Sequence, residues 1–347
     1  PLTQWPDQEK IRNYISKLDL SVYNGLTLNI NCYYFDYILP AATWVESGGV
    51  SPVSDDSRFV WTPRLIEPPG EARPGRWWWI ELGKRMGFGD ILRDEFKDPV
   101  VLQDYVGFEK GFTVDRFLAK KDNSLRAPIN VKEGKVYERS TLFLDKKFPT
   151  RSEKIELWTQ EMELKFNKYG LAAIPEFYMD SDISCGSEKT LLYNRKALIL
   201  SPFQKNKTFT YKVSFTTGSG KKEKFPFYLL TGRPSSAIMG HTSHWIKRLN
   251  DISPVQFCLI HPEAAENIGV KHGERVKVSS PYGETVAEID TTQRIRKDTV
   301  FIPYSYGEKS PFTQWRSVNF LTSMVDRCPV SGQIPFKGVS VAIEKIK

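Results

Sequence analysis

The chain has 347 residues, of which 40% are hydrophobic and 13% aromatic, a composition that excludes a largely disordered protein and provides for two or three cores. It contains no run of about 18 apolar residues, so the sequence predicts no membrane span. The net charge of +8 favours anionic partners, but the basic residues are spread along the chain, so nucleic acid is not an expected partner.

The first predicted element is an amphipathic helix within residues 7–24, whose apolar residues at helical spacing are Ile11, Tyr14, Ile15 and Leu18. Residues 33–42 then form an apolar run that predicts a strand, which Pro40 ends. The next segment, residues 47–58, is rich in serine, glycine and aspartate and predicts a loop.

A rigid turn is predicted at residues 67–75, which contain three prolines and two glycines. Residues 76–87 predict a helix with Trp79, Leu82 and Met86 on one face, ended by Gly87. We expect its three tryptophans to serve packing rather than ligand stacking. The order of strand, loop and helix predicts a partial α/β domain over residues 1–105.

Residues 106–224 have less regular patterns and predict a mixed connecting region. Within it, residues 148–170 predict a short strand followed by a helix. Residues 207–224 alternate in polarity and predict a strand or hairpin that ends in a flexible loop rich in glycine, serine and lysine. We place a domain boundary at this loop.

The last region, residues 225–347, contains six β-like segments separated by glycine-containing turns. These segments are residues 225–230, 257–260, 275–280, 285–290, 299–303 and 339–346. Residues 262–269 predict one short helix, with Pro262 in its first turn and Gly269 at its end. Six strands with a single short helix predict a small β-barrel.

Two of the four histidines, His241 and His244, lie three positions apart in this region, and a metal site is one interpretation of them. No third ligand lies at a suitable spacing, which argues against that interpretation. The cysteines are Cys32, Cys185, Cys258 and Cys328, and none is in a C-x-x-C spacing. The sequence therefore predicts no zinc ribbon and no iron–sulfur cluster held by this chain alone.

Several segments, taken together and in order, closely resemble the molybdopterin oxidoreductases, the family of dimethyl sulfoxide reductase. They are "FDYILPAATWVESGG", "EPPGEARPGRWWWIELGKRMG", "FPTRSEKIELWTQEME", "LLTGR", "HPEAAENIGVKHGERVKVSSPYGE" and the ending "CPVSGQIPFKGVSVAIEK". Glu153 stands where the family usually has glycine. The resemblance covers nearly the whole chain and corresponds to the C-terminal half of the catalytic subunit.

This resemblance implies a double-psi β-barrel that binds a bis(molybdopterin guanine dinucleotide) cofactor carrying molybdenum or tungsten. Such a cofactor presents pyrophosphates and heteroaromatic edges, which backbone N–H groups, arginine, amides and hydroxyls can bind. The residues that it implies as cofactor contacts are Thr231, Gly232, Arg233, His241, Thr242, Ser243, Asn319, Thr322 and Lys337. It implies no metal ligand and no assigned catalytic residue in this chain.

Family members are about twice as long, so we expect an N-terminal half in the same polypeptide or in a separate chain. The iron–sulfur motif and the metal ligand are expected only there, and an iron–sulfur electron-transfer subunit is an expected partner. No signal peptide pattern is present at residues 1–10, and the cysteine content fits a reducing compartment. A cytoplasmic location is therefore expected, or a periplasmic one if the missing N-terminus carries an export signal.

Among subfamilies, the chain is most similar to formate dehydrogenases and to thiosulfate or polysulfide reductases. Two alternatives stay open at the level of the sequence. One is a non-redox family member, such as a hydratase or a transhydroxylase. The other is a non-catalytic subunit that binds the cofactor or serves assembly.

Overall fold

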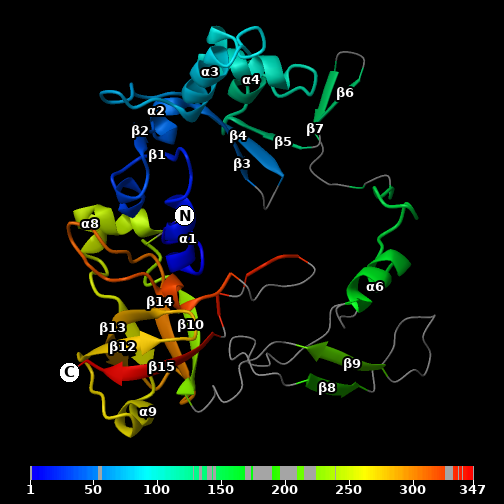
Figure 1. The fold of residues 1–347 in the computed structure, drawn as a ribbon. Helices are drawn as coiled ribbons and strands as arrows, with labels where there is room; N and C mark the ends of the chain where they lie inside the picture. Colours follow the sequence, from blue (N-terminus) through cyan, green and yellow to red (C-terminus); the bar gives the residue numbers. More distant parts are fainter. Residues whose placement is uncertain are drawn as a thin grey trace. The chain divides into compact units, whose positions relative to one another are not determined.

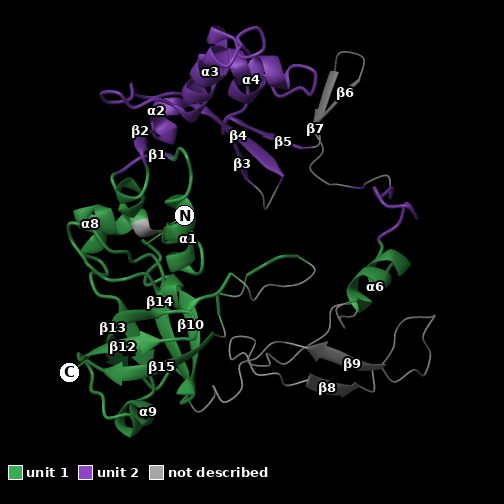
Figure 2. Cartoon of the chain, viewed as in Figure 1, with its two compact units in different colours: residues 1–21, 28–35, 156–347 green, residues 22–27, 36–155 purple. Residues whose placement is uncertain are grey.

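The computed structural model describes residues 2–53, 57–127, 129–132, 135–138, 143, 146–168, 173–174, 190–195, 209–214, 224–238, 240–324, 331–334, 336–337 and 339–346. The chain divides into two compact units (Figure 1 and Figure 2). The barrel unit comprises residues 1–21, 28–35 and 156–347, and the mixed unit comprises residues 22–27 and 36–155. The expected boundaries at residues 105 and 224 do not coincide with these units.

The barrel unit contains a closed barrel of six strands, in the order β10, β14, β11, β13, β12 and β15 around its wall. These strands are β10 (Phe227–Gly232), β11 (Phe257–Ile260), β12 (Arg275–Ser279), β13 (Glu284–Thr291), β14 (Thr299–Pro303) and β15 (Val339–Lys345). The pairs β10·β14 and β11·β13 are parallel, and the other neighbours are antiparallel. The six predicted strand segments are thus confirmed as strands of one closed mixed barrel.

Side chains along the barrel strands alternate between the interior and the outside, as in any strand with one buried face. In β13, Thr285, Ala287 and Ile289 are buried, and the residues between them are partly exposed. The interior is a single apolar core, to which the strands contribute Leu229, Cys258, Ile260, Val276, Val278, Ala287, Ile289, Val300, Ile302 and Val341. Full burial of each aliphatic side chain of this size stabilises the fold by about 1.5–3 kcal/mol.

The predicted short helix is confirmed as α9 (Pro262–Asn267), which packs Ala264 and Ala265 into the barrel core. His261 caps its start, because the imidazole Nδ1 accepts a 3.3 Å hydrogen bond from the backbone N–H of Glu263. Gly269 follows the helix with a φ of 71°, a left-handed conformation that glycine adopts without strain.

The N-terminal segment belongs to the barrel unit, through α1 (Gln8–Ile15) and the 3₁₀ turn η1 (Ile30–Tyr33). Leu2, Ile11, Ile15 and Ile30 form a small second core. The backbone N–H of Asp7 donates a 3.0 Å hydrogen bond to the carbonyl of Thr322, beside the barrel. Of the predicted apolar face of α1, Ile11 and Ile15 are buried, whereas Tyr14 and Leu18 are more than half exposed.

The remaining elements of the barrel unit are short. They are α6 (Gln160–Asn167), β8 (Thr190–Arg195), β9 (Phe209–Ser214), η4 (His241–Trp245), α8 (Lys247–Asn250) and η5 (Val318–Leu321). Strand β9 confirms the strand predicted within residues 207–224, and its antiparallel partner is β8 upstream. The helix predicted within residues 148–170 is confirmed as α6, but the short strand predicted before it is absent from that described segment. Glu153 instead turns the chain there, with a φ of 53°.

The mixed unit combines small sheets with short helices. Its strands are β1 (Val22–Gly25), β2 (Tyr37–Pro40), β3 (Gly49–Val53), β4 (Arg58–Thr62), β5 (Ser124–Arg126), β6 (Ile129–Lys132) and β7 (Lys135–Glu138). Its helices are α2 (Trp44–Ser47), α3 (Gly75–Arg85), η2 (Asp94–Lys97), α4 (Pro99–Gly107) and α5 (Val114–Leu118). Strands β1 and β2 form a parallel pair, whereas β3, β4 and β5 form an antiparallel sheet.

The loop predicted at residues 47–58 is wrong for Gly49–Val53, which form β3. This strand pairs with the β-branched and aromatic run of β4, from Gly49 opposite Thr62 to Val53 opposite Arg58. A segment with serines and glycines adopts an extended conformation here because its partner has strong strand propensity.

Helix α3 confirms the helix predicted within residues 76–87, and Gly87 follows it with a φ of 89°. The prediction that its tryptophans serve packing is wrong for Trp79, which is 70% exposed. Leu82 and Met86, on the same face, are also largely exposed, and the helix buries Ile80 and Gly83 instead. Among the described residues, no helix is both long enough and apolar enough to cross a bilayer.

Candidate functional site

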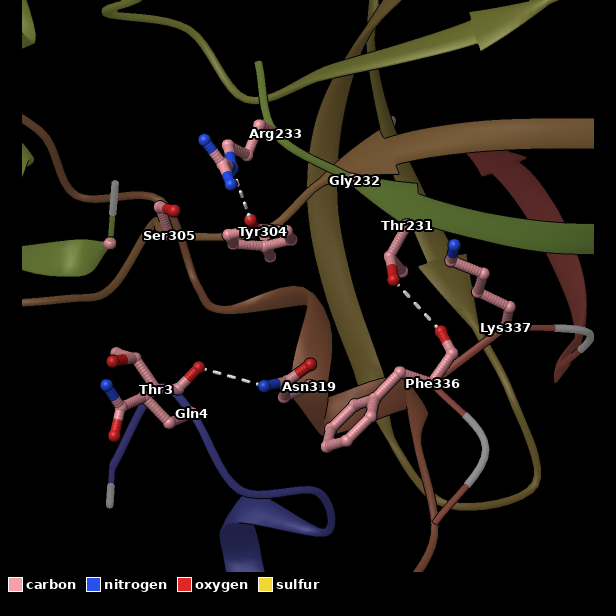
Figure 3. Close-up of a pocket in the computed structure, with 11 residues that line it drawn as sticks. Thr3, Gln4, Thr231, Gly232, Arg233, Tyr304, Ser305, Asn319, Phe336 and Lys337 are labelled. Carbon is pink, nitrogen blue, oxygen red and sulfur yellow. Dashed lines mark hydrogen bonds between the residues drawn. The ribbon is translucent and has the colours of Figure 1, made fainter. Parts of the chain in front are cut away.

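A pocket of about 640 Å³ opens in the barrel unit where β10 and β14 end (Figure 3). Its volume lies within the range of small-molecule and cofactor sites. Six separate chain segments line it, and their residues are Thr3, Gln4, Thr231, Gly232, Arg233, Gly240, Tyr304, Ser305, Asn319, Phe336 and Lys337.

The pocket follows from the parallel pairing of β10 with β14, which sets Gly232 beside Pro303. Because parallel strands end on the same side, the residues that follow them, Arg233 and Tyr304, enter the pocket wall together. The backbone N–H of Tyr304 donates a 3.0 Å hydrogen bond to the carbonyl of Gly232. The guanidinium Nε of Arg233 donates a 3.2 Å bond to the phenol oxygen of Tyr304.

Glycine at position 232 leaves room for the ring of Phe301 on the neighbouring strand. A Cβ at this position would lie 2.8 Å from Cε2 of Phe301, too close for a carbon–carbon contact. The close approach brings the backbone of β10 against the aromatic ring of β14.

The other walls are held by side-chain hydrogen bonds to backbone. The amide Nδ2 of Asn319 donates a 2.8 Å bond to the carbonyl of Thr3, which fixes the N-terminal segment at the pocket. The hydroxyl of Thr231 donates a 3.0 Å bond to the carbonyl of Phe336 (Figure 3). These two side chains therefore shape the pocket as well as line it.

The groups in the pocket match a ligand that carries phosphates and planar rings. Arg233 and Lys337 supply two positive charges on exposed side chains, and Tyr304 and Phe336 supply aromatic faces. Two buried hydroxyl oxygens on the lining residues, those of Thr3 and Ser305, have no hydrogen-bond partner among the described residues. A ligand with acceptor atoms fits this set of donors.

Next to the pocket, η4 carries the second histidine of the pair noted in the sequence. The ring of His244 is buried, stacks on Tyr306 at 4.1 Å, and lies 3.1 Å from the Asn250 side-chain oxygen through Nδ1. Burial lowers the pKa of His244 below its ordinary value and raises the pKa of Tyr306 to about 12. His244 is therefore a neutral, packed side chain at pH 7, and the described residues contain no group of three His, Cys, Asp or Glu side chains that could hold a metal.

Of the nine residues that the sequence suggested as cofactor contacts, five line this one pocket: Thr231, Gly232, Arg233, Asn319 and Lys337. Thr242, Ser243 and Thr322 do not line it, and the side chain of His241 lies outside what the structure describes. The hydroxyl of Thr322 donates a 3.0 Å bond to the carbonyl of Asn319, so Thr322 supports a lining residue.

The pocket is also lined by residues that were not predicted as cofactor contacts, among them Thr3, Gln4, Tyr304, Ser305 and Phe336. Tyr304 and Ser305 follow β14 directly, and their nearness to Arg233 depends on the parallel pairing, which a single sequence does not specify.

Comparison with protein families gives a match of residues 227–340 to the Molydopterin dinucleotide binding domain. Three relatives are similar over most of the chain. Nitrate reductase of Symbiobacterium thermophilum is 26% identical over 98% of this chain and 39% of its own length. The thiosulfate reductase molybdopterin-containing subunit of Salmonella typhimurium is 23% identical over 85% and 35%. F420-dependent formate dehydrogenase subunit alpha of Methanocaldococcus jannaschii is 22% identical over 100% and 42%.

The chain thus spans between 35% and 42% of the length of these three relatives. Among solved structures, acetylene hydratase from Pelobacter acetylenicus matches with a TM-score of 0.72 and 20% identity. That match covers 99% of this chain and 43% of the hydratase chain, and at this identity it establishes a shared fold only.

Proposed function

We propose that the chain is the C-terminal part of the catalytic subunit of a molybdopterin oxidoreductase. The support is the match of residues 227–340 to the Molydopterin dinucleotide binding domain and the similarity of nearly the whole chain to a nitrate reductase and to a formate dehydrogenase subunit. The barrel unit binds a bis(molybdopterin guanine dinucleotide) that carries molybdenum or tungsten. The observation that carries this proposal is the pocket at the ends of β10 and β14, with its two cations and aromatic walls.

In this proposal the chain's own residues bind and orient the cofactor. Arg233 and Lys337 attract its phosphates, and Arg233 is held toward the pocket by Tyr304. Thr231 and Asn319 keep the walls in place through their bonds to Phe336 and Thr3. The bound metal centre supplies the redox chemistry, and the protein supplies position and electrostatics. Contacts from His241, Thr242, Ser243 and Thr322 to other parts of the cofactor stay a prediction.

The barrel is proposed to be of the double-psi type. The support is its topology, in which two parallel pairs, β10·β14 and β11·β13, join through the antiparallel contact of β14 with β11. Each parallel pair ends in a loop on the barrel rim, and the loops after β10 and β14 form the pocket.

The proposed partner is the remaining part of the catalytic subunit, in the same polypeptide or in a second chain. Strands β1 and β2 form a two-stranded parallel pair with apolar side chains exposed, among them Val22 and Ile38 at 43% each. Parallel sheets are normally covered on both faces. The exposed face of α3 around Trp79 is a second surface of this kind. The iron–sulfur cluster and the metal ligand are proposed to lie in that remaining part, with an iron–sulfur subunit as electron-transfer partner.

For the reaction, we propose formate oxidation or thiosulfate or polysulfide reduction, and the similarity to relatives named formate dehydrogenase and thiosulfate reductase supports the first two. A non-redox reaction is the alternative, but the likeness to acetylene hydratase is one of fold and does not select among reactions. Assays of formate oxidation and thiosulfate reduction with artificial electron carriers distinguish these substrates directly.

The test of cofactor binding uses the protein purified in its native assembly. We expect molybdenum or tungsten by elemental analysis, and guanine nucleotide released from the denatured protein, in a fixed ratio to the chain. Arg233→Ala and Lys337→Ala should each lower that ratio. Lys297→Ala is the matched control, because Lys297 pairs with Glu263 on the surface and does not line the pocket.

Native assembly that contains neither metal nor guanine nucleotide would contradict the proposal. Equal nucleotide content in the Arg233, Lys337 and Lys297 variants would mean that the dinucleotide is bound elsewhere. Nucleotide and metal without oxidoreductase activity on any tested substrate would favour the non-redox or the non-catalytic alternative.

A further inference from the structure

We propose that the hydroxyl groups of Thr3 and Ser305 donate hydrogen bonds directly to acceptor atoms of the dinucleotide, and so determine how tightly the pocket retains it. This inference rests on the proposed function. Thr3 and Ser305 lie far apart in the chain. Their hydroxyl groups would bind the dinucleotide by hydrogen bonds, in addition to the charges that Arg233 and Lys337 provide.

Ser305 combines three features that are hard to explain by the fold alone. Its side chain is 3% exposed, and its Oγ is buried without a hydrogen-bond partner among the described residues. Its φ is 92°, a region that L residues rarely adopt and that glycine enters freely. A strained backbone and an unpaired buried hydroxyl both destabilise a protein, and such features are retained where they serve a site.

Ser305 lies in the wall of the pocket at the ends of β10 and β14. Ser305 lines the pocket next to Tyr304, whose phenol oxygen accepts the bond from Arg233 (Figure 3). A hydroxyl donor beside a guanidinium suits a ligand oxygen that carries negative charge, such as that of a phosphate.

Thr3 presents the same feature from the N-terminal segment. It is 4% exposed, and its Oγ1 is buried without a hydrogen-bond partner in the described part of the chain. Its backbone is fixed on both sides, because Asn319 binds its carbonyl and the N–H of Leu2 donates a 3.2 Å bond to Asn31 Oδ1. Its methyl group Cγ2 lies 2.8 Å from where a Cβ of Gly307 would be, so the methyl packs against the segment that follows Ser305, and Thr3 lines the same pocket as Ser305.

Loss of either hydroxyl should lower cofactor retention without lowering the stability of the protein. Removing an unpaired buried hydroxyl leaves the stability of the cofactor-free protein unchanged or raised, because nothing is lost but an unsatisfied group. The same change removes a donor from the bound cofactor. A residue with a structural role would show the opposite, since stability and cofactor retention would fall together.

Two matched pairs of variants test this in the native assembly with its cofactor. Thr3→Val is compared with Thr313→Val, because Thr313 Oγ1 is likewise buried without a hydrogen-bond partner among the residues that the structure describes, but Thr313 does not line the pocket. Ser305→Gly is compared with Lys309→Gly, because Lys309 also has a positive φ, of 69°, outside the pocket. Ser305→Ala serves as a second variant that removes the hydroxyl without adding glycine's freedom.

The readouts are guanine nucleotide per chain across a urea series, and the melting temperature of cofactor-free protein. We expect Thr3→Val and Ser305→Gly to lower nucleotide retention by about tenfold each, the effect of one lost hydrogen bond to a charged or polar ligand. Their melting temperatures should be equal to, or above, that of the unchanged protein. Thr313→Val and Lys309→Gly should retain the nucleotide fully.

Retention in Thr3→Val and Ser305→Gly equal to that of their controls overturns the inference, as does a parallel fall in retention and melting temperature. Failure of the proposed function has a different signature. In that case the Arg233→Ala variant also retains its nucleotide, or the native assembly contains none.

Discussion

The side-chain amide of Asn319 donates a 2.8 Å hydrogen bond to the carbonyl oxygen of Thr3, which lies 316 residues earlier in the chain. Asn319 is itself positioned by η5, where its backbone N–H donates a 3.2 Å bond to the hydroxyl of Ser317. Both residues are buried, at 4% exposed each. It joins the N-terminal segment to the barrel at the edge of the pocket.

Asn319→Ala should lower the free energy of unfolding by about 1–3 kcal/mol, because the carbonyl of Thr3 is left buried without its donor. Urea unfolding curves measure this change. Asn267→Ala, at the exposed end of α9, is the matched control and should change stability by less than about 0.5 kcal/mol. Equal stabilities of the two variants would mean that the Thr3 carbonyl is satisfied in another way.

Gly232→Ala should destabilise the barrel by about 1–3 kcal/mol, because its Cβ would meet the ring of Phe301 at 2.8 Å. Gly240→Ala is the control, since this glycine also lines the pocket but has nothing within 4 Å of an added Cβ. Combining Gly232→Ala with Phe301→Leu should recover part of the loss in thermal unfolding. A Gly232→Ala variant as stable as Gly240→Ala would contradict the close approach.

His244 should make stability depend on pH on the acid side. Burial lowers its pKa in the folded state below the ordinary value of 6.5, so the unfolded chain takes up a proton that the folded chain does not. The free energy of unfolding should therefore fall as the pH drops below about 6.5, with a contribution of up to about 1.4 kcal/mol per pH unit. Urea unfolding between pH 5 and 8 should show a steeper slope for the native sequence than for His244→Phe. Identical slopes would mean that the pKa of His244 is the same in the folded and the unfolded chain.

The two described cysteines should differ in reactivity. Cys258 is fully buried in the barrel core, and burial raises the pKa of its thiol to about 12, so almost no thiolate forms at neutral pH. Cys32 is only half-buried. Iodoacetamide at pH 8, followed by peptide mapping with mass spectrometry, should label Cys32 in the folded protein and Cys258 only after unfolding. Labelling of Cys258 in native protein at the rate of Cys32 would indicate that the barrel opens.

The strands of the barrel were predictable because their side chains alternate in burial within a single closed core. In β12 and β13, each apolar residue at every second position faces that core, and glycine turns separate the strands. The prediction of a loop at residues 47–58 was wrong for Gly49–Val53, because pairing with β4 holds these residues in a strand. Pairing with a partner is a tertiary effect that local composition does not contain.

The candidate site was predictable only where the family resemblance marked residues. It marked Thr231, Gly232 and Arg233, which lie at the end of β10, but not Tyr304 and Ser305, which follow its parallel neighbour β14. Glu153, which the resemblance marked as a departure from an expected glycine, adopts a φ of 53°, and the sequence did not predict this conformation. The prediction that the tryptophans of α3 are packed was wrong for Trp79. The sequence shows that this side chain is apolar, but it does not show whether another part of the protein covers it.

The bond between Asn319 and Thr3 also bears on when the pocket can form during synthesis. The two bonded residues both line the pocket and are 316 residues apart in the sequence. Forming this bond therefore closes one of the longest loops in the chain. Contacts of such sequence separation form late in folding. Residues near the N-terminus of this sequence therefore leave the ribosome long before their partners exist, and the pocket becomes complete only after the barrel strands have been made. Loading of a ligand into this pocket is consequently an event that follows translation rather than one that guides it.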